Sequence, residues 1–295
     1  MLLLGLPAFD DYELLDCGNF KKLERFGQFI LSRPEPQAIW SPSWSEAEWT
    51  KKVHATFTRK TNTTENAEDG NWDLKPNMPE QWYIQYQFQQ MQLRFRLGLT
   101  AFKHVGIFPE QAENWNYIYQ GLQKMPIAQP LVLNLFAYTG GASLAAKAAG
   151  ADVVHVDSVK PVVTWARQNM EASKLENIRW TVEDALKFVR KEVKRGKQYQ
   201  AIILDPPAYG RGPEGEKWLL DKHLPELLEA CSQILDKSYH LMILNLYSMG
   251  YSALIAENLV KQYFPFVKHP DFGELYLTDR ANRKLPLGVF ARFMN

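Results

Sequence analysis

Short apolar runs alternate with amphipathic segments throughout the second half of the chain. Runs with the length and composition of strands buried on both faces of a sheet occupy residues 131–136, 152–156, 178–182, 201–204 and 239–246. Segments of helical periodicity separate them, which is typical of parallel strands joined by crossover helices. The pattern predicts a Rossmann-like, doubly wound α/β fold with a mostly parallel seven-stranded sheet. Residues 272–277 and 287–293 are expected to form an antiparallel hairpin at its carboxyl-terminal end.

The first ninety residues follow a different pattern. Short strand-like runs separated by glycine and proline lie at residues 12–15, 28–31 and 38–40. They predict a small antiparallel β-rich domain over residues 1–88, and the apolar opening Met1–Phe9 is interpreted as a strand. Residues 89–125 are expected to form a connector, or a lid over a ligand, ahead of a ligand-binding domain over residues 126–295. No segment is long and apolar enough to span a membrane.

Composition narrows the possible functions only slightly. Lys and Arg number 34 against 33 for Asp and Glu, so the net charge gives no argument for a polyanionic partner. Six basic residues between Lys187 and Lys197 form either a phosphate track or, as we favour, a solvated helix stripe. Five tryptophans in the first part favour a β-domain core over a base-stacking surface; they are Trp40, Trp44, Trp49, Trp72 and Trp82. Cys17 and Cys231 have no metal-ligand spacing, which predicts no metal site and a reducing, cytoplasmic location.

The strand at residues 131–136 runs into a glycine turn that predicts a ligand site. Tyr138, Thr139, Gly140 and Gly141 separate this strand from an alanine-rich helix, and Gly150 follows the helix as a left-handed cap. Glycines allow backbone to approach a ligand closely, and the helix N-terminus offers unpaired N–H groups. The spacing lacks the G-x-G-x-x-G pattern of a pyrophosphate cradle. An adenosine cofactor without phosphates fits better, and S-adenosylmethionine is the candidate.

Polar residues follow the next strands at the same edge of the predicted sheet. Asp157 comes seventeen positions after Gly140 and is placed to bind a ribose, although an Asp in this position is also a common helix cap. Asp184 follows the third strand and has the same two interpretations, with adenine as its possible ligand. Ser158 is expected to cap the helix that contains Pro161.

The segment Asp205-Pro206-Pro207-Ala208-Tyr209 follows the fourth strand. Two prolines can neither extend a strand nor begin a helix at once, so they predict a stiff turn. Such a turn can hold a carboxylate against a planar amine or amide while Tyr209 stacks on its ring. Methyl transfer from a sulfonium needs mainly this kind of alignment.

Taken in order, these segments resemble the class I S-adenosylmethionine-dependent methyltransferases. The segments are Asn134–Gly141, Asp157-Ser158, Glu183-Asp184-Ala185 and Asp205–Tyr209. Within that class, the bacterial methyltransferases of large-subunit ribosomal RNA that act on cytosine C5 or guanine N7 are the most similar. The resemblance covers about residues 90–295, and residues 12–40 resemble the small β domain that precedes the catalytic domain in this group.

The resemblance implies a role for each segment. It implies that the glycine turn holds the methionine part of the cofactor; its residues are Asn134, Phe136, Tyr138, Thr139, Gly140 and Gly141. Asp157, with Ser158 beside it, would bind the ribose and Asp184 the adenine. Asp205, Pro206, Pro207 and Tyr209 would face the acceptor.

One departure from the family affects the predicted acceptor. Cytosine-C5 members carry a cysteine nucleophile after the fifth strand, where this chain has Asn245-Leu246-Tyr247-Ser248. Without a thiol, covalent activation of a pyrimidine carbon is disfavoured. We therefore expect methylation of a nucleobase nitrogen in RNA, with ribosomal RNA as the partner. A small-molecule or protein acceptor, a silent cofactor-binding scaffold and a nicotinamide-dependent dehydrogenase remain as alternatives, and the oligomeric state is left open.

Overall fold

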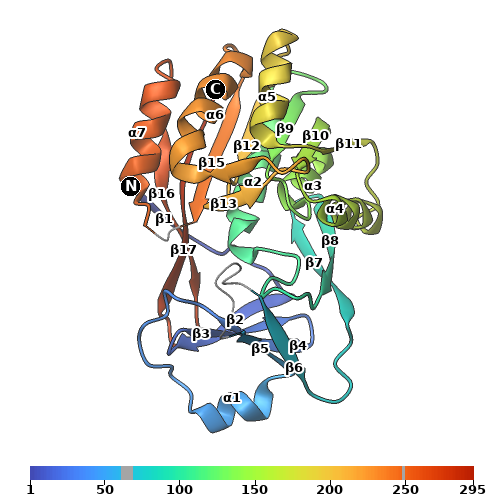
Figure 1. Ribbon diagram of the computed structural model, residues 1–295, viewed down its shortest axis with the longest axis vertical. Helices are drawn as coiled ribbons and strands as arrows, with labels where there is room; N and C mark the ends of the chain where they lie inside the picture. The colour runs from blue at the N-terminus through green and yellow to red at the C-terminus, as the bar shows by residue number, and fades with distance from the viewer. Residues whose placement is uncertain (61–68, 248–249) are drawn as a thin grey trace.

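A large, mostly parallel sheet forms one end of the molecule in this computed structural model, which describes residues 1–60, 69–247 and 250–295 (Figure 1). Its strand order is β1-β16-β17-β15-β12-β9-β10-β11. The parallel strands are β9 (Leu131–Leu135), β10 (Asp152–Asp157), β11 (Ile178–Val182), β12 (Ala201–Leu204) and β15 (Leu241–Tyr247). The hairpin of β16 (Asp271–Thr278) and β17 (Lys284–Met294) adds to β15 antiparallel. The predicted fold class is therefore confirmed.

One strand of this sheet comes from the start of the chain. β1 (Leu2–Gly5) pairs parallel with β16, so the sheet has eight strands rather than the expected seven. The close approach of β1 to β16 depends on Gly273, where a Cβ atom would lie 1.8 Å from the carbonyl oxygen of Leu2. The strand predicted within Met1–Phe9 is therefore confirmed, but a pairing partner at positions 273–276 leaves no local signal. β1 joins the large sheet rather than the N-terminal one, and the boundaries at residues 88 and 125 stay a prediction.

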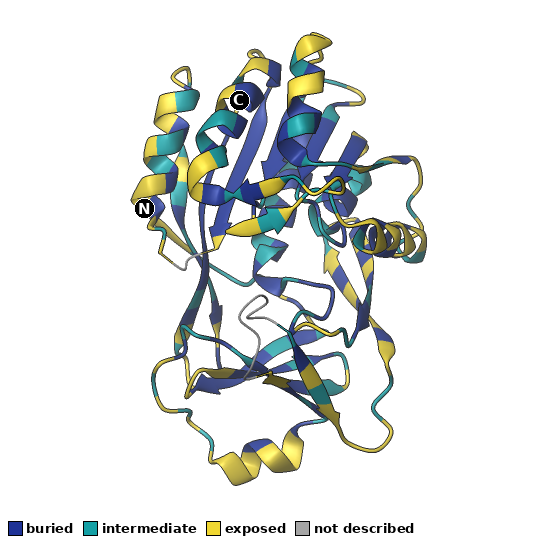
Figure 2. Ribbon diagram, in the orientation of Figure 1, coloured by how far each residue is buried: buried dark blue, intermediate teal, exposed yellow. Residues whose placement is uncertain are grey.

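Helices cover both faces of the large sheet. One face carries α5 (Ala185–Lys194), α6 (Leu220–Ile234) and α7 (Ala253–Tyr263), and the other carries α2 (Ala112–Lys124), α3 (Gly141–Ala148) and α4 (Lys160–Ala172). Strand residues alternate between these layers, so Val132 packs with α2–α4 and Leu133 packs with α5–α7. Figure 2 shows the strands buried between helices whose outer faces are exposed. Among the described residues, no helix combines the length and apolarity that a membrane crossing requires.

A five-stranded sheet forms the opposite end of the molecule. It contains β2 (Tyr12–Gly18), β3 (Lys21–Phe26), β4 (Phe29–Pro34), β5 (Ala55–Arg59) and β6 (Gly70–Leu74), with α1 (Glu46–Lys52) outside it. The hairpin of β7 (Gln81–Phe88) and β8 (Met91–Gly98) connects this sheet to the rest of the chain. Most pairs are antiparallel, as predicted, but β4 and β5 pair parallel.

Two details of the N-terminal prediction change. The strand expected at residues 38–40 is wrong, because these residues are irregular and follow a turn that the Ala38 amide closes by donating to the Glu35 carbonyl. The charged β3 was not predicted. The tryptophans pack in the core, as the sequence favoured. Trp49 and Trp82 are buried, and Trp40, Trp44 and Trp72 are half-buried against other side chains.

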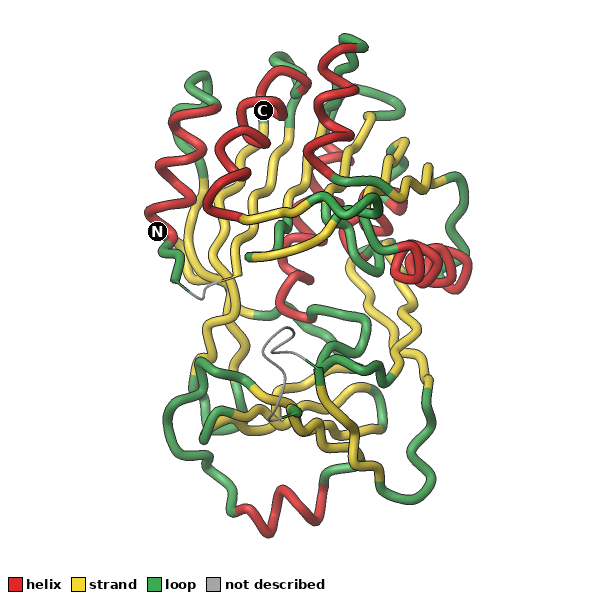
Figure 3. The backbone as a smooth tube through the Cα atoms, in the orientation of Figure 1, coloured by secondary structure: helices red, strands yellow, loops and turns green. Residues whose placement is uncertain are grey.

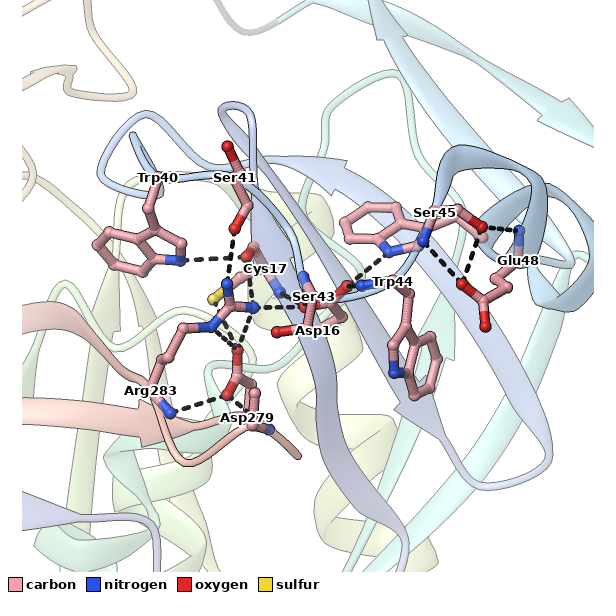
Figure 4. A network of polar contacts seen from close by, with 12 residues as sticks. Asp16, Cys17, Trp40, Ser41, Ser43, Trp44, Ser45, Glu48, Asp279 and Arg283 are labelled. Atoms are coloured by element: carbon pink, nitrogen blue, oxygen red, sulfur yellow. Dashed lines mark hydrogen bonds and ion pairs between the residues drawn. The ribbon is translucent and has the colours of Figure 1, made fainter.

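The turn between β16 and β17 ties the large sheet to the small one (Figure 4). Arg283 in this turn donates to Asp279 and to the backbone carbonyls of Ser41 and Cys17, and it forms an ion pair with Asp16. Asp16 is fully buried and also accepts a hydrogen bond from the Trp49 indole at 2.8 Å. The ion pair therefore fixes the orientation of the two sheets. We refer to Asp16, Asp279 and Arg283 as the clamp between the sheets.

Candidate cofactor and acceptor site

The topological switch point of the large sheet lies between β9 and β12. The chain proceeds from β9 to β10 and β11 on one side, whereas β12 and β15 lie on the other. Ligands of doubly wound sheets bind beyond the carboxyl ends of the strands at such a point. Figure 3 shows loops on the side of the large sheet that faces the N-terminal sheet. A hollow of about 520 Å³, including space open to solvent, lies here, and we refer to it as the cofactor hollow.

Seven of the residues singled out from the sequence line the cofactor hollow. They are Asn134, Phe136, Tyr138, Thr139, Gly140, Gly141 and Asp205. The first six come from β9 and the turn after it, and Asp205 comes from the turn after β12. The structure therefore places the two most informative segments of the sequence side by side.

The glycine turn has a strained backbone. Phe136 and Tyr138 have φ values of 53° and 48°, in the left-handed region that bulky residues avoid, and Gly140 has φ 95°. Hydrogen bonds hold this conformation. The Tyr138 amide donates to Asp157 at 2.9 Å, and the Thr139 hydroxyl donates to the Gly106 carbonyl at 2.7 Å. Strain maintained in this way is typical of ligand-binding turns.

The N-terminus of α3 opens into the cofactor hollow. No side chain caps this end of the helix, which leaves its first N–H groups to a ligand. Gly141 begins the helix beside Trp115, where a Cβ atom would lie 2.6 Å from the indole. Trp115 in turn packs on Phe95 with ring centres 5.2 Å apart. An uncapped helix end against an aromatic wall suits a ligand that has both polar and apolar parts.

A buried hydrogen-bonded chain fixes the side chain of Asn134. Its amide donates to the Ser143 hydroxyl at 2.9 Å, and this oxygen lies 3.0 Å from His155 Nδ1. Burial lowers the pKa of His155 to about 3, so the imidazole is neutral at physiological pH. The chain is therefore a neutral support beneath the turn rather than a proton relay.

Three more predicted residues lie together in a smaller acidic hollow, of about 240 Å³, which shares Phe136 with the cofactor hollow. They are Asp157, Ser158 and Asp184. Asp157 accepts hydrogen bonds from the backbone of Tyr138 and Val159, both at 2.9 Å, and burial raises the pKa of its carboxyl. A carboxylate offers about four acceptor positions. The backbone of Ser158 contributes a further hydrogen bond, so a position remains for a hydroxyl donor on Asp157.

The helix caps differ in part from the expectation. Asp184 does cap α5, by accepting a hydrogen bond from the Lys187 amide at 2.8 Å, while its adenine role stays a prediction. Ser158 does not cap α4, whose N-cap is Val159. Asp157 already binds the Val159 amide, so the serine is not needed there.

The diproline turn contributes one of its predicted residues to the cofactor hollow. Asp205 lines it, and burial together with the charge of Glu110 raises the pKa of the Asp205 carboxyl to about 7. Pro206 is buried behind it, and the Pro207 carbonyl accepts a hydrogen bond from the Trp218 indole at 2.7 Å. Tyr209 is 51% exposed and lies outside the lining.

The exposed position of Tyr209 follows from a short arm beyond the diproline turn. Here β13 (Tyr209–Arg211) pairs with β14 (Lys217–Leu219), and α6 begins directly after this pair, at Leu220. The Arg211 guanidinium donates to the Tyr209 hydroxyl at 2.9 Å. In this arrangement Tyr209 does not stack on a ligand in the cofactor hollow.

A buried group of three side-chain amides was not predicted. Asn245 at the end of β15 donates to Gln111 at 2.9 Å, and Asn114 donates to Gln111 and to Asn245, both at 3.0 Å. All three residues line the cofactor hollow. Gln111 and Asn114 share a helix face at i, i+3 spacing, and this was the available signal. Ser248, considered together with Asn245, lies outside the described residues.

The sequence of residues 31–257 matches the profile of the S-adenosylmethionine-dependent methyltransferases. The chain belongs to this family. The structure of the S-adenosylmethionine-dependent methyltransferase from Agrobacterium tumefaciens is 35% identical to it, with a TM-score of 0.90 over 100% of this chain and 93% of that chain. S-adenosylmethionine is the cofactor of this methyltransferase, and the uncapped α3 and the strained turn fit such a ligand.

Parts of the methyltransferase are similar to proteins named for ribosomal RNA. It is 30% identical over 131 residues to a putative ribosomal RNA large subunit methyltransferase of Methanocaldococcus jannaschii, covering 44% of this chain and 33% of the relative. It is 42% identical over 81 residues to ribosomal RNA large subunit methyltransferase I of Photobacterium profundum, covering 26% and 20%. The chain thus spans a third or less of these relatives. A putative methyltransferase solved with SAH shares the fold at 20% identity and a TM-score of 0.72, over 96% of this chain and 75% of that chain.

The structure bears on the interpretation of the six basic residues between Lys187 and Lys197. The basic residues of α5 pair with acidic neighbours: Lys187 with Glu214 and Glu216, Arg190 with Glu226, and Lys191 with Glu183. These pairs support the interpretation of a solvated stripe.

Proposed function

We propose that the protein transfers a methyl group from S-adenosylmethionine to a nucleobase nitrogen of RNA, with ribosomal RNA as the first candidate. The observation that carries the proposal is Asp205, a carboxyl with a pKa near 7 at the switch point of the sheet. The named relatives of Methanocaldococcus and Photobacterium support ribosomal RNA as the substrate class. A ribosomal RNA substrate implies a cytoplasmic location.

The two hollows suggest how the cofactor lies. Its methionine part would bind at the glycine turn and at the N-terminus of α3, in the cofactor hollow. One of its ribose hydroxyls would donate to Asp157, and its adenine would lie by Asp184 and Ser158 in the acidic hollow. Phe136 lines both hollows and would contact the middle of the molecule.

The proposed chemistry needs one proton acceptor. The acceptor nitrogen forms a bond to the methyl carbon while the carbon–sulfur bond breaks and its electron pair moves to sulfur. The methylated nitrogen then loses a proton, which the ionised Asp205 carboxylate accepts. A base whose pKa lies near the working pH is effective because much of it is ionised while it still binds a proton.

The thiols of the chain favour nitrogen over carbon as the acceptor. Carbon methylation of a pyrimidine through a covalent adduct requires a reactive thiolate near the cofactor. Cys231 lies on the buried face of α6, and burial raises the pKa of its thiol. Cys17 lies by Asp279 in the clamp between the sheets, where burial raises its pKa to about 12. Neither thiol lines the cofactor hollow.

The test compares modified nucleosides in ribosomal RNA from cells with and without the gene. Mass spectrometry should show one methylated nucleoside missing from the deletion strain, and purified protein with S-adenosylmethionine should restore it in vitro. Wild-type protein that binds the cofactor but methylates none of the ribosomal RNA from the deletion strain would contradict the proposal.

A further inference from the structure

A second polar hollow lies between the N-terminal sheet and the catalytic sheet. It measures about 380 Å³, including open space, and we refer to it as the interdomain hollow. β3, β4, β15, β17 and the segment 103–110 supply its lining. Ile107 and Phe108 line both this hollow and the cofactor hollow, so the two adjoin.

Buried ion pairs hold one wall of the interdomain hollow. The Arg33 guanidinium donates two hydrogen bonds of 2.8 Å to the fully buried Glu24. Lys22 lies 3.4 Å from Glu35, which is also buried. Because Arg33 pairs with Glu24 and Lys22 pairs with Glu35, each buried charge in this wall has a counter-ion and the side chains are held in place.

Glu110 also lines the interdomain hollow. It is 8% exposed, and within the described part of the chain no side chain donates a hydrogen bond to its carboxyl. Burial raises the pKa of this carboxyl, although its own backbone amide and the charges of Lys22 and Arg33 oppose the rise. A carboxylate offers about four acceptor positions, so Glu110 can still accept a hydrogen bond from a ligand that enters the hollow.

Phe108 separates Glu110 from the cofactor turn. Its ring lies 5.2 Å from the ring of Tyr138, measured between centres. The charge of Glu110 contributes to the raised pKa of Asp205, which shows that the two carboxyls are near enough to interact. A flat molecule lying along Phe108, with one edge at Glu110, would therefore bring its other atoms toward Asp205 and the cofactor hollow.

We propose that the interdomain hollow receives the acceptor nucleobase and that Glu110 recognises it through a ring or exocyclic N–H group. This inference rests on the proposed function and specifies its substrate pocket. A base turned out of its stack is read at its polar edge while apolar and aromatic side chains contact its faces. Phe108, Leu287 and Tyr247 supply such surfaces, and Glu110 supplies the polar contact.

Two substitutions at Glu110 test this inference. Glu110→Gln keeps the shape of the side chain and removes its charge, and Glu110→Met removes its hydrogen bond at similar volume. Hydrogen bonds to charged groups contribute about 1.5–3 kcal/mol, so we expect kcat/KM for ribosomal RNA from the deletion strain to fall about 10–100-fold. Affinity for SAH, measured by calorimetry, should stay within about twofold, since Glu110 does not line the cofactor hollow.

Glu176→Gln is the matched control, because Glu176 is exposed and remote from both hollows. Thermal unfolding identifies variants that fail to fold, and with two substitutions of different polarity at least one is expected to be interpretable. Rates within twofold of wild type in a folded Glu110 variant would overturn the inference. An equal loss of SAH affinity would also overturn it, because Glu110 would then belong to the cofactor site.

A second measurement separates this inference from the proposed function. If the wild type methylates no RNA, the proposed function fails, and the interdomain hollow is judged by binding alone. Equilibrium dialysis with each of the four nucleoside monophosphates, at saturating SAH, should then show binding to wild type that is weaker in Glu110→Met. Absence of binding to wild type, or equal binding to both proteins, would overturn the inference.

Discussion

Replacement of Asp205 tests the proposed chemistry most directly. Burial and the charge of Glu110 raise the pKa of this carboxyl to about 7, so its ionised fraction increases through neutral pH. The kcat/KM of the wild type should rise with pH, with a midpoint near 7, and then level off. Asp205→Asn keeps the shape of the side chain but accepts no proton. It should lower kcat/KM about 10²–10⁴-fold and abolish the rise near pH 7.

The same substitution should stabilise the fold at alkaline pH. The folded protein holds the Asp205 proton more tightly than the unfolded chain, whose carboxyl has the ordinary pKa of 3.8. The stability of the wild type is therefore fully present below that value and is lost as pH rises through about 7. About three pKa units correspond to about 4 kcal/mol. Because the residue is partly exposed, we expect about half of this, ~2 kcal/mol, as the gain of Asp205→Asn at pH 8 relative to pH 4.

Urea unfolding at both pH values and a pH–rate profile measure these two effects. Asp221→Asn, at an exposed position in the first turn of α6, serves as the control and should change neither. A rise of kcat/KM near pH 7 that persists in Asp205→Asn would refute the role of this carboxyl as the base. An unchanged pH dependence of stability would refute the raised pKa.

Three further substitutions test the cofactor site and the clamp between the sheets. Gly141→Ala places a Cβ atom against the Trp115 indole, so we expect calorimetry to show SAH binding that is at least tenfold weaker. An unchanged affinity would show that the indole moves aside without cost. Asp157→Ala removes the acceptor of the Tyr138 amide and should also weaken SAH binding by at least tenfold. A dissociation constant for SAH equal to that of the wild type would show that Asp157 does not contribute to the cofactor site. Arg283→Ala leaves Asp16 buried without its counter-ion and should cost about 3–5 kcal/mol in urea unfolding. A loss under 1 kcal/mol would show that the backbone donors to Asp16 suffice.

The large sheet could be predicted because its strands are covered on both faces. Burial on both sides requires unbroken apolar runs such as those at 131–136 and 239–246, and glycine marks the turn that the cofactor needs. The strand β1 was predicted, but its pairing with β16 could not be, since the partner lies about 270 residues away and only the finished sheet brings them together. The N-terminal strands were predicted less well, because β3 is rich in charged residues that pair across the sheet rather than alternate with apolar ones.

The candidate site was predicted in its backbone and less well in its side chains. Strand ends identified the turn at 136–141, Asp157 and Asp205, because topology alone brings these ends to one edge. The amide group around Asn245 joins β15 to the start of α2, so the i, i+3 spacing of Gln111 and Asn114 was only part of its signal. Glu110 meets the interdomain hollow only in the folded chain, and no spacing revealed it. Tyr209 was assigned to the site because it belongs to the same sequence segment as Asp205, but the β13–β14 arm turns its side chain outward.

The pairing of β1 with β16 also constrains the order of events during synthesis. Residues 2–5 leave the ribosome well before their partners at 273–276, which are translated roughly 15–55 s later at about 5–20 residues per second. Throughout that interval the apolar segment Leu2–Leu4 has no strand to join and is open to chaperones. Completion of the catalytic sheet therefore waits for residues 271–278, and a nascent chain stalled before residue 271 would lack both this pairing and the ion pair of Arg283 with Asp16.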